Sequence, residues 1–209
     1  MTSINHNMPS KQNQSGFALL ITIILVSVIL SIGLSVLDLS IKQVRLSSNS
    51  ASSEVAFHAA NAGVECARYW RSEQENQFIN GSNLTNISCF DAPNIPVVVP
   101  YTIPTLPPSS GRAYRSGGGV AYQYEYQFTW GTNLRRCTQI NTIVARADLI
   151  GSGVTITDMD DLIDGYPGNV IFFCDAGSRC TAVSVKGYNR PCAASFGRGT
   201  VQREVLLQY

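Results

Sequence analysis

The chain has 209 residues, of which 44% are apolar and only 14% are charged, and its formal net charge is +1. This apolar content supports a folded core and excludes a wholly disordered chain. No broad basic field exists of the kind that nucleic-acid-binding proteins carry. With only two histidines, His6 and His58, the chain offers little of the side-chain chemistry of histidine-dependent enzymes or zinc sites. We therefore expect no enzymatic activity, no cofactor and no metal.

The first strong feature is an apolar run over residues 17–37, which contains no charge and no proline. A helix of this length spans about 30 Å, the thickness of the hydrocarbon core of a bilayer. We expect a transmembrane helix, because the alternative, a buried core helix, is rarely apolar on every side. The preceding residues 1–16 are polar, and no small-residue cleavage site follows the run. Any processing point is therefore expected before the run, at Gly16.

The junction Ser15-Gly16-Phe17, followed by the apolar run, resembles the class III signal of type IV pilins and pseudopilins. The resemblance implies that a prepilin peptidase cuts after Gly16 and methylates the new amino terminus on Phe17. Major pilins typically have glutamate at the fifth mature position, where it is thought to meet the amine of a neighbouring subunit. Here that position is Ile21. This departure resembles the minor subunits, including the tip pseudopilin of type II secretion systems.

A second stretch, Ala56-Phe57-His58-Ala59-Ala60-Asn61-Ala62-Gly63, resembles the N-terminal region of PilX-type minor pilins. The resemblance covers residues 16–68. It implies a low-copy structural subunit of a type IV pilus or type II secretion-like filament, acting at assembly initiation or at the tip. The implied partners are other pilin subunits, the prepilin peptidase and the assembly platform in the inner membrane. The implied location is that membrane, with the head extracytoplasmic, and then a surface or periplasmic filament.

An alternative function is that of a signal-anchored extracytoplasmic protein whose head binds a ligand and never polymerises. The flanking charges do not separate the two functions. Lys42 and Arg45 follow the apolar run while only Lys11 and the α-amine precede it, which slightly opposes an N-inside topology. The role of the filament, in adhesion, DNA uptake, motility or secretion, is not specified by the sequence.

The helical pattern continues beyond the membrane run. No proline occurs between residues 17 and 80, so one helix of about 55 to 60 residues is predicted, with an amphipathic second half over 38–78. The alternative is an anchor followed by a separate soluble helix. The expected buried stripe of the second half consists of Ala51, Val55, Ala59, Ala62, Cys66 and Tyr69.

The remaining residues, 79–209, are predicted to form a loop-rich β head, which makes the fold class α+β. Six prolines between residues 93 and 108 exclude a helix or a central strand there. In Tyr122–Trp130, aromatic and polar residues alternate, which predicts a strand that buries five rings against the helix rather than binding a sugar. We expect further strands at 142–150, 169–174, 181–186 and 200–209, and a glycine-rich turn at 109–119, in one antiparallel sheet.

The chain has six cysteines without a CxxC pair: Cys66, Cys89, Cys137, Cys174, Cys180 and Cys192. In an exported head these form disulfides. Cys174 with Cys180 suits a bridge across a hairpin, Cys66 with Cys89 is a second reasonable pair, and Cys137 with Cys192 then follows by elimination. Sequence alone does not choose among the pairings that six cysteines allow.

Two further motifs carry open alternatives. The carboxylates of the acidic run Asp158–Asp164 suggest a calcium site, but Leu162 occupies a position where an EF-hand needs an oxygen ligand. We expect instead that Thr157 and Asp160 form a capping box for a short helix that ends at Gly165. Residues 80–88 contain three Asn-x-Ser/Thr triplets, which are glycan acceptors only in a cell with the matching transferase.

Overall fold

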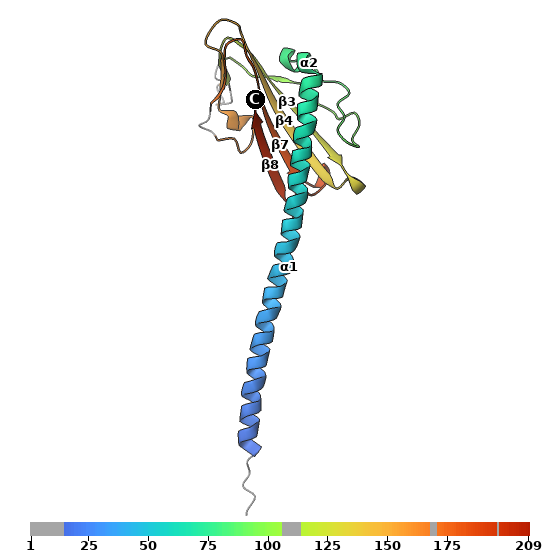
Figure 1. Ribbon diagram of the computed structural model, residues 1–209, viewed down its shortest axis with the longest axis vertical. Coiled ribbons are helices and arrows are strands. Elements are labelled where there is room, and N and C mark those ends of the chain that lie inside the picture. Colours follow the sequence, from blue (N-terminus) through green and yellow to red (C-terminus); the bar gives the residue numbers. More distant parts are fainter. Residues whose placement is uncertain (1–14, 106–113, 168–170, 196) are drawn as a thin grey trace, which may run out of the picture. The chain divides into compact units, whose positions relative to one another are not determined.

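The computed structural model describes residues 15–105, 114–167, 171–195 and 197–209. The chain divides into two compact units at Ser48. Helix α1 (Ser15–Glu73) contributes to both units, and its 59 residues agree with the predicted length. The fold class is α+β, as predicted, because the second half of α1 packs on an antiparallel sheet (Figure 1).

The described part of the first unit, residues 15–48, is helical throughout. Every described side chain from Gly16 to Ser48 is exposed, including the large apolar ones. Such a surface is unfavourable in water and favourable in lipid or against other apolar helices. This segment therefore needs a covering that the unit itself does not contain.

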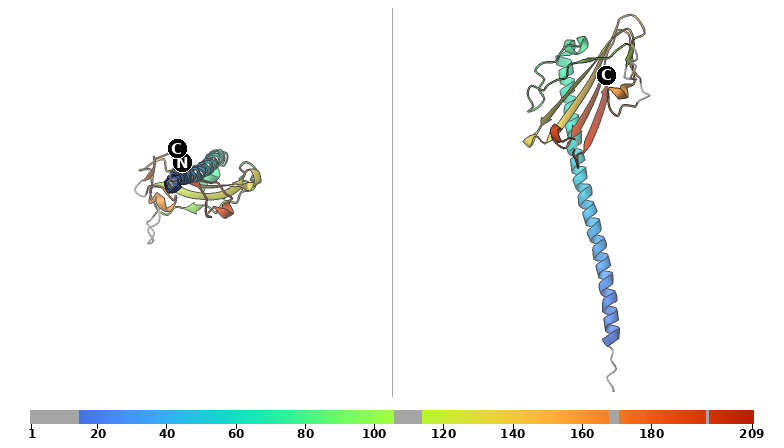
Figure 2. Two further views of the ribbon diagram at one scale, coloured as in Figure 1. Left: turned by 90° about the horizontal axis from the view of Figure 1, so that it is seen from below. Right: turned by 180° about the vertical axis from the view of Figure 1, so that it is seen from behind.

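The second unit is built on a five-stranded antiparallel sheet of order β1-β3-β4-β7-β8. The views in Figures 1 and 2 place α1 along one face of this sheet. Opposed residues of an antiparallel sheet share a face, so the register Tyr126–Ile140–Val185–Val205 identifies the face toward the helix. The strands are β1 (Tyr101–Thr102), β3 (Gly119–Trp130), β4 (Arg136–Ala147), β7 (Arg179–Tyr188) and β8 (Gln202–Gln208).

A second, three-stranded sheet covers part of the opposite face, where the sequence had predicted a single sheet. It has the order β2-β5-β6, from β2 (Tyr114–Gly117), β5 (Val154–Thr157) and β6 (Phe172–Cys174). Its inner side chains form a separate core cluster with Ile143 and Ala145 of β4. The glycine-rich segment does not join two paired strands, because β2 pairs with β5 and not with β3. Its residues 109–113 lie outside the described part.

The strand bounds differ from the prediction mainly at β4. This strand begins at Arg136 and ends at Ala147, whereas residues 142–150 were expected. Leu149 and Ile150 lie in a turn, with 87% and 91% of their surface exposed, and their β-forming side chains misled the prediction. Residues 169 and 170 of another predicted strand lie outside the described residues. The described residues of the unit also form three short 3-10 helices: Thr132–Leu134, Met159–Asp161 and Cys192–Ala194.

The helix approaches the sheet very closely, and glycines on both elements permit it. A Cβ on Gly187 of β7 would lie 2.2 Å from both Ala56 O and Ala60 N of the helix backbone. A Cβ on Gly63 would lie 2.3 Å from Thr138 Cγ2. The Thr138 hydroxyl donates a hydrogen bond of 3.0 Å to Ala59 O. The helix backbone therefore contacts the sheet directly, without intervening large side chains.

This contact rotates the buried stripe relative to the one that the sequence predicted. Ala59 and Cys66 are buried as expected, but Ala51 and Tyr69 are exposed. The stripe follows the residues small enough for the close approach, which outweighs the larger apolar area of Tyr69. The small residues Ala56, Ala60, Gly63 and Ala67 follow one another at helical spacings of four, three and four.

The alternating aromatic segment is confirmed as the core of the helix-facing side. Four of its five rings are buried, and Tyr122 is partly buried. The Tyr124 hydroxyl donates to Gln77 O at 2.8 Å, and Phe78 packs edge-on against the Tyr124 ring with centroids 4.6 Å apart. The Tyr126 hydroxyl has no hydrogen-bond partner among the described residues. The aromatic face of β3 is thus occupied in packing against the helix side of the head, as expected.

Helix α1 ends at Glu73, whereas its amphipathic half was predicted to extend over 38–78. The backbone of Gln74 leaves the helical region, at φ −112° and ψ 38°. Its side-chain amide donates to Thr85 O at 2.7 Å and its oxygen accepts from Thr85 N at 3.4 Å. This clamp competes with continued helix, and a short second helix, α2 (Glu75–Asn80), follows.

We predict that Gly187→Ala destabilises the head by about 1–3 kcal/mol or more, because the added methyl group meets helix backbone that cannot rotate away. Gly33→Ala is the matched control, since a Cβ there has no atom within 4 Å. Urea unfolding of the detergent-solubilised chain, followed by tryptophan fluorescence, measures both. Equal stability of the two variants would show that the helix does not lie this close to β7.

A second prediction concerns the two core tyrosines. Tyr124→Phe should cost about 1 kcal/mol at neutral pH, because a backbone carbonyl loses its donor. Tyr126→Phe should cost nothing, since it removes a buried hydroxyl without a partner. Urea unfolding at about pH 7 distinguishes them. A larger loss in Tyr126→Phe than in Tyr124→Phe would contradict the hydrogen-bond assignment.

The same tyrosines predict sensitivity to alkali. Burial raises the pKa of Tyr124 and of Tyr126 above the ordinary value of 10.0. Below about pH 10 both phenols are neutral in the folded and in the unfolded chain, so their contribution to folding stability is fully present. Between that pH and the raised pKa values, only the unfolded chain ionises, so stability falls as pH rises. In the Tyr126→Phe variant the fall should be shallower, and an unchanged slope would contradict the burial of Tyr126.

Candidate functional site

The apolar first half of α1 is the feature with the clearest functional meaning. Gly16 and Phe17 lie in the first turn of the helix, and Phe17 is 73% exposed. Ile21 follows one turn later, with 41% of its surface exposed. Among the described residues, α1 is the one helix long and apolar enough to cross a membrane.

The hydroxyl groups of this segment are bonded within the helix. Thr22 donates to Leu19 O and Ser27 to Ile24 O, each at 2.8 Å. Ser35 makes the same kind of bond, to Ser31 O at 2.9 Å. In lipid, polar groups must find partners inside the segment. These hydroxyls therefore fit the hydrocarbon core, although they interrupt the apolar sequence.

The apolar segment ends at the first charged side chains of the described helix. Lys42 Nζ and Asp38 Oδ2 form an exposed ion pair of 2.7 Å, one helical turn apart. A surface pair of this kind contributes little stability. Its position is informative, because both charges need water or lipid headgroups and so fix where the apolar environment ends.

The head contains three disulfides, and all six cysteines take part. The pairs are Cys66–Cys89, Cys137–Cys192 and Cys174–Cys180, the pairs that the sequence favoured. Cys66–Cys89 ties the second half of α1 to the loop after α2, and Cys137–Cys192 closes 55 residues, which contributes about 4 kcal/mol by loop entropy. An apolar N-terminal helix with a disulfide-bonded head indicates a membrane-anchored protein whose head is extracytoplasmic.

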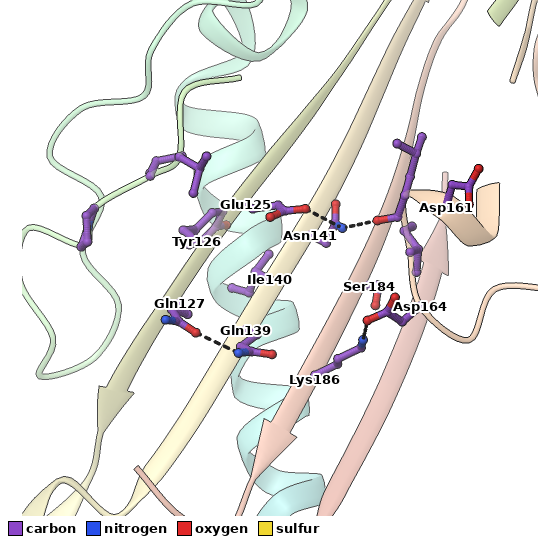
Figure 3. Close-up of a pocket in the computed structure, with 15 residues that line it drawn as sticks. Glu125, Tyr126, Gln127, Gln139, Ile140, Asn141, Asp161, Asp164, Ser184 and Lys186 are labelled. Carbon is purple, nitrogen blue, oxygen red and sulfur yellow. Dashed lines mark hydrogen bonds and ion pairs between the residues drawn. The ribbon is translucent and has the colours of Figure 1, made fainter. Parts of the chain in front are cut away.

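A polar groove of about 570 Å³ crosses the face of the sheet opposite to α1. Figure 3 shows side chains of β3, β4 and β7 forming its floor, with the helix behind the strands. Gln139 Nε2 donates to Gln127 Oε1 at 2.8 Å, and Asn141 Nδ2 donates to Glu125 Oε1 at 3.4 Å. The polar residues of β3, which the alternation predicted to face water, therefore accept hydrogen bonds from polar side chains of the neighbouring strand β4.

Two segments outside the main sheet border the groove, residues 96–98 and 161–164. Val98 N donates to Glu125 O at 2.9 Å, which fixes the first segment along β3. The second is held by Lys186, whose Nζ lies 2.9 Å from Asp164 Oδ2. Sequence reasoning missed this groove, because it is assembled from residues that are distant in the chain.

The acidic run therefore serves as one edge of the groove. The Leu162 carbonyl accepts a bond from the Asn141 amide. The predicted capping box is wrong, because Thr157 Oγ1 donates to Tyr114 O at 3.4 Å and Asp158, not Thr157, precedes the short helix. In the described part of the chain no three His, Cys, Asp or Glu side chains are grouped as a metal site.

No protein-family model, no curated protein and no solved structure matches this chain. The class of protein is therefore defined by architecture. A long N-terminal helix, apolar in its first half and packed on an antiparallel sheet by its second half, is a pilin-like architecture.

We predict that no thiol of the exported protein reacts when it is denatured without reduction. All six sulfurs lie in disulfides in the structure, so labelling with N-ethylmaleimide and mass measurement should find none modified. The reduced and denatured chain is the control and should take up six labels. Six labels without reduction would place the head in a reducing compartment and reverse the topology.

Proposed function

We propose that the protein is a minor pilin or pseudopilin, a structural rather than catalytic subunit of a type IV pilus or type II secretion-like filament. One observation carries the proposal. The single helix α1 is exposed and apolar over 17–37, yet buried residues of its second half belong to the core of the head: Ala59, Ala60, Val64, Cys66 and Ala67. Such a helix can leave the membrane and pack against the helices of other subunits while its head stays folded.

Processing is the second part of the proposal. The apolar run begins immediately after Ser15-Gly16, which supports cleavage after Gly16 by a prepilin peptidase and methylation of Phe17. The stretch from Ala56 to Gly63 supports a PilX-like subunit. The proposed partners are other pilin subunits, the peptidase and the inner-membrane assembly platform, and the proposed destination is a surface or periplasmic filament.

The absence of a carboxylate at Ile21 supports a low copy number. An amine without a partner in an apolar filament core costs several kcal/mol, since a charge removed from water needs a counter-charge. A subunit with isoleucine at this position cannot supply that counter-charge to its neighbour. It is tolerated at an end of the fibre or rarely within it, which favours a role in assembly initiation or at the tip.

The processing prediction is a mature protein that begins at Phe17, with 193 of the 209 residues and a methylated amine. Intact-mass measurement and N-terminal sequencing of protein from the native host test it. Gly16→Leu, which enlarges the residue before the cleavage point, should accumulate the uncleaved chain. Retention of Met1 in the native protein would contradict the pilin proposal and favour a plain anchor.

The stoichiometry prediction uses Ile21→Glu, which restores the carboxylate. We expect the native chain at low copy in sheared filaments and a several-fold rise for Ile21→Glu, measured by quantitative mass spectrometry. Ile21→Gln is the matched control, since it is polar but uncharged, and it should not raise the copy number. If the native chain were the dominant component, the carboxylate argument would be wrong for this filament.

The groove on the outer sheet face favours a second candidate, an anchored protein that binds a ligand and does not polymerise. Its floor of amide and carboxylate groups suits a ligand rich in hydroxyl or amide groups. Sheared filaments again distinguish the two, because an anchored binder remains with the membrane fraction.

A further inference from the structure

Three arginines converge on a second cavity of the head, of about 380 Å³, where α1 ends. Arg68 and Arg71 lie one turn apart on α1, so their side chains leave the same face of the helix. Arg179 comes from the start of β7. Among the described side chains that line the cavity, Glu75 is the one carboxylate, and its Oε1 lies 2.7 Å from Arg179 Nη1. Glu65, which does not line the cavity, lies 3.9 Å from Arg68 Nη1. The lining side chains therefore carry a formal excess of two positive charges.

Arg71 is the unusual member of the group. It is only 8% exposed, and its Nε donates to the Thr181 hydroxyl at 3.1 Å. Its guanidinium also lies over the Phe78 ring, 5.7 Å from the centroid. No ion pair includes Arg71 among the described residues. Burial lowers the pKa of Arg71, and the nearby Glu75 only partly offsets this effect.

A buried guanidinium without a carboxylate partner is costly, because its lost hydration is not replaced by a counter-charge. A cation near a helix C-terminus interacts favourably with the helix dipole, which accounts for an arginine in the last turn. The dipole does not account for the arrival of Arg179 from another element. Several guanidinium groups directed at one cavity are the usual means of holding a group with two or more anionic oxygens.

We propose that this cavity binds an oxyanion, a phosphate or a carboxylate group, held by Arg68, Arg71 and Arg179. Thr181 orients Arg71 by accepting its Nε bond, which leaves the two terminal nitrogens for the ligand. Tyr209 lies at the edge of the cavity and adds a phenol near Arg68 and Arg71. Glu75 competes with the anion for Arg179. This cavity shares no lining residue with the groove on the opposite sheet face.

Equilibrium dialysis of the full-length, detergent-solubilised chain with radiolabelled inorganic phosphate, at constant ionic strength in chloride, tests the proposal. We expect saturable binding of one phosphate per chain. Acetate is the second probe: displacement of phosphate by acetate at equal concentration identifies a carboxylate site, and retention of phosphate identifies a phosphate site. Both results support an oxyanion pocket, whereas no saturable binding of either anion overturns it.

Variants of the lining residues should change the affinity for phosphate in opposite directions. Arg71→Gln and Arg179→Gln should each weaken binding about tenfold or more. Arg179 is half exposed, so its variant remains informative even if Arg71→Gln fails to fold. Glu75→Gln should tighten binding, because it removes the competing carboxylate. Arg146→Gln is the matched control: Arg146 lies opposite Arg179 in the strand register but does not line the cavity. An equal loss in Arg146→Gln, or weaker binding in Glu75→Gln, overturns the proposal.

Discussion

The direct contact between the helix backbone and the sheet is the constraint on which the rest of the head depends. The Thr138 hydroxyl lies at its centre, donating to Ala59 O at 3.0 Å and accepting from Trp130 Nε1 at 2.9 Å. Thr138 is fully buried, so the loss of either bond would leave a polar group without water. The bonds require the close approach, and Gly63 and Gly187 make that approach possible. Small residues and buried hydrogen bonds therefore specify one position of the helix on the sheet.

This arrangement lets one helix serve two environments. In its first half the side chains are apolar on all sides and the hydroxyls bond to carbonyls of the preceding turn. In its second half small residues face the sheet, and polar ones such as Glu65 and Arg68 remain exposed. The disulfide Cys66–Cys89 then ties the end of this half to the loop after α2. A pilin-like subunit needs this division, because its head must stay folded when the surroundings of the first half change.

The elements of this architecture that depend on local sequence patterns could be predicted from the sequence. The length and composition of the run over 17–37 favour a transmembrane helix over a buried core helix, and the alternation in Tyr122–Trp130 favours a strand with one aromatic face. The short separations of Cys174 from Cys180 and of Cys66 from Cys89 favoured those two pairs, and Cys137 with Cys192 followed only by elimination. These features depend on neighbouring residues, or on loops short enough to close.

What could not be predicted depends on residues that are distant in the chain. The local sequence does not show that Gly187 lies against the helix backbone. It also makes Tyr69 a plausible core residue, because the contact that leaves Tyr69 exposed is determined by small residues elsewhere on the helix and the sheet. The local sequence does not predict the pairing of β2 with β5, because the glycine-rich segment before β3 is typical of a hairpin turn. The groove and the arginine cavity are likewise formed by segments that meet only in the fold. Polar alternation in β3 indicated an outer face, but not that residues 96–98 and 161–164 border it.

Hydrogen exchange of the full-length chain in detergent micelles tests the central claim, that the second half of α1 is part of the head's core, most directly. Amides of residues 56–67 should exchange with the same free energy as the central amides of β4 and β7, because the helix can be released from the sheet only when the core opens. Amides of the exposed residues 149–152 in the same head provide the rapidly exchanging reference. Fast exchange of residues 56–67 while β4 and β7 remain protected would show that the helix detaches independently and would contradict the account.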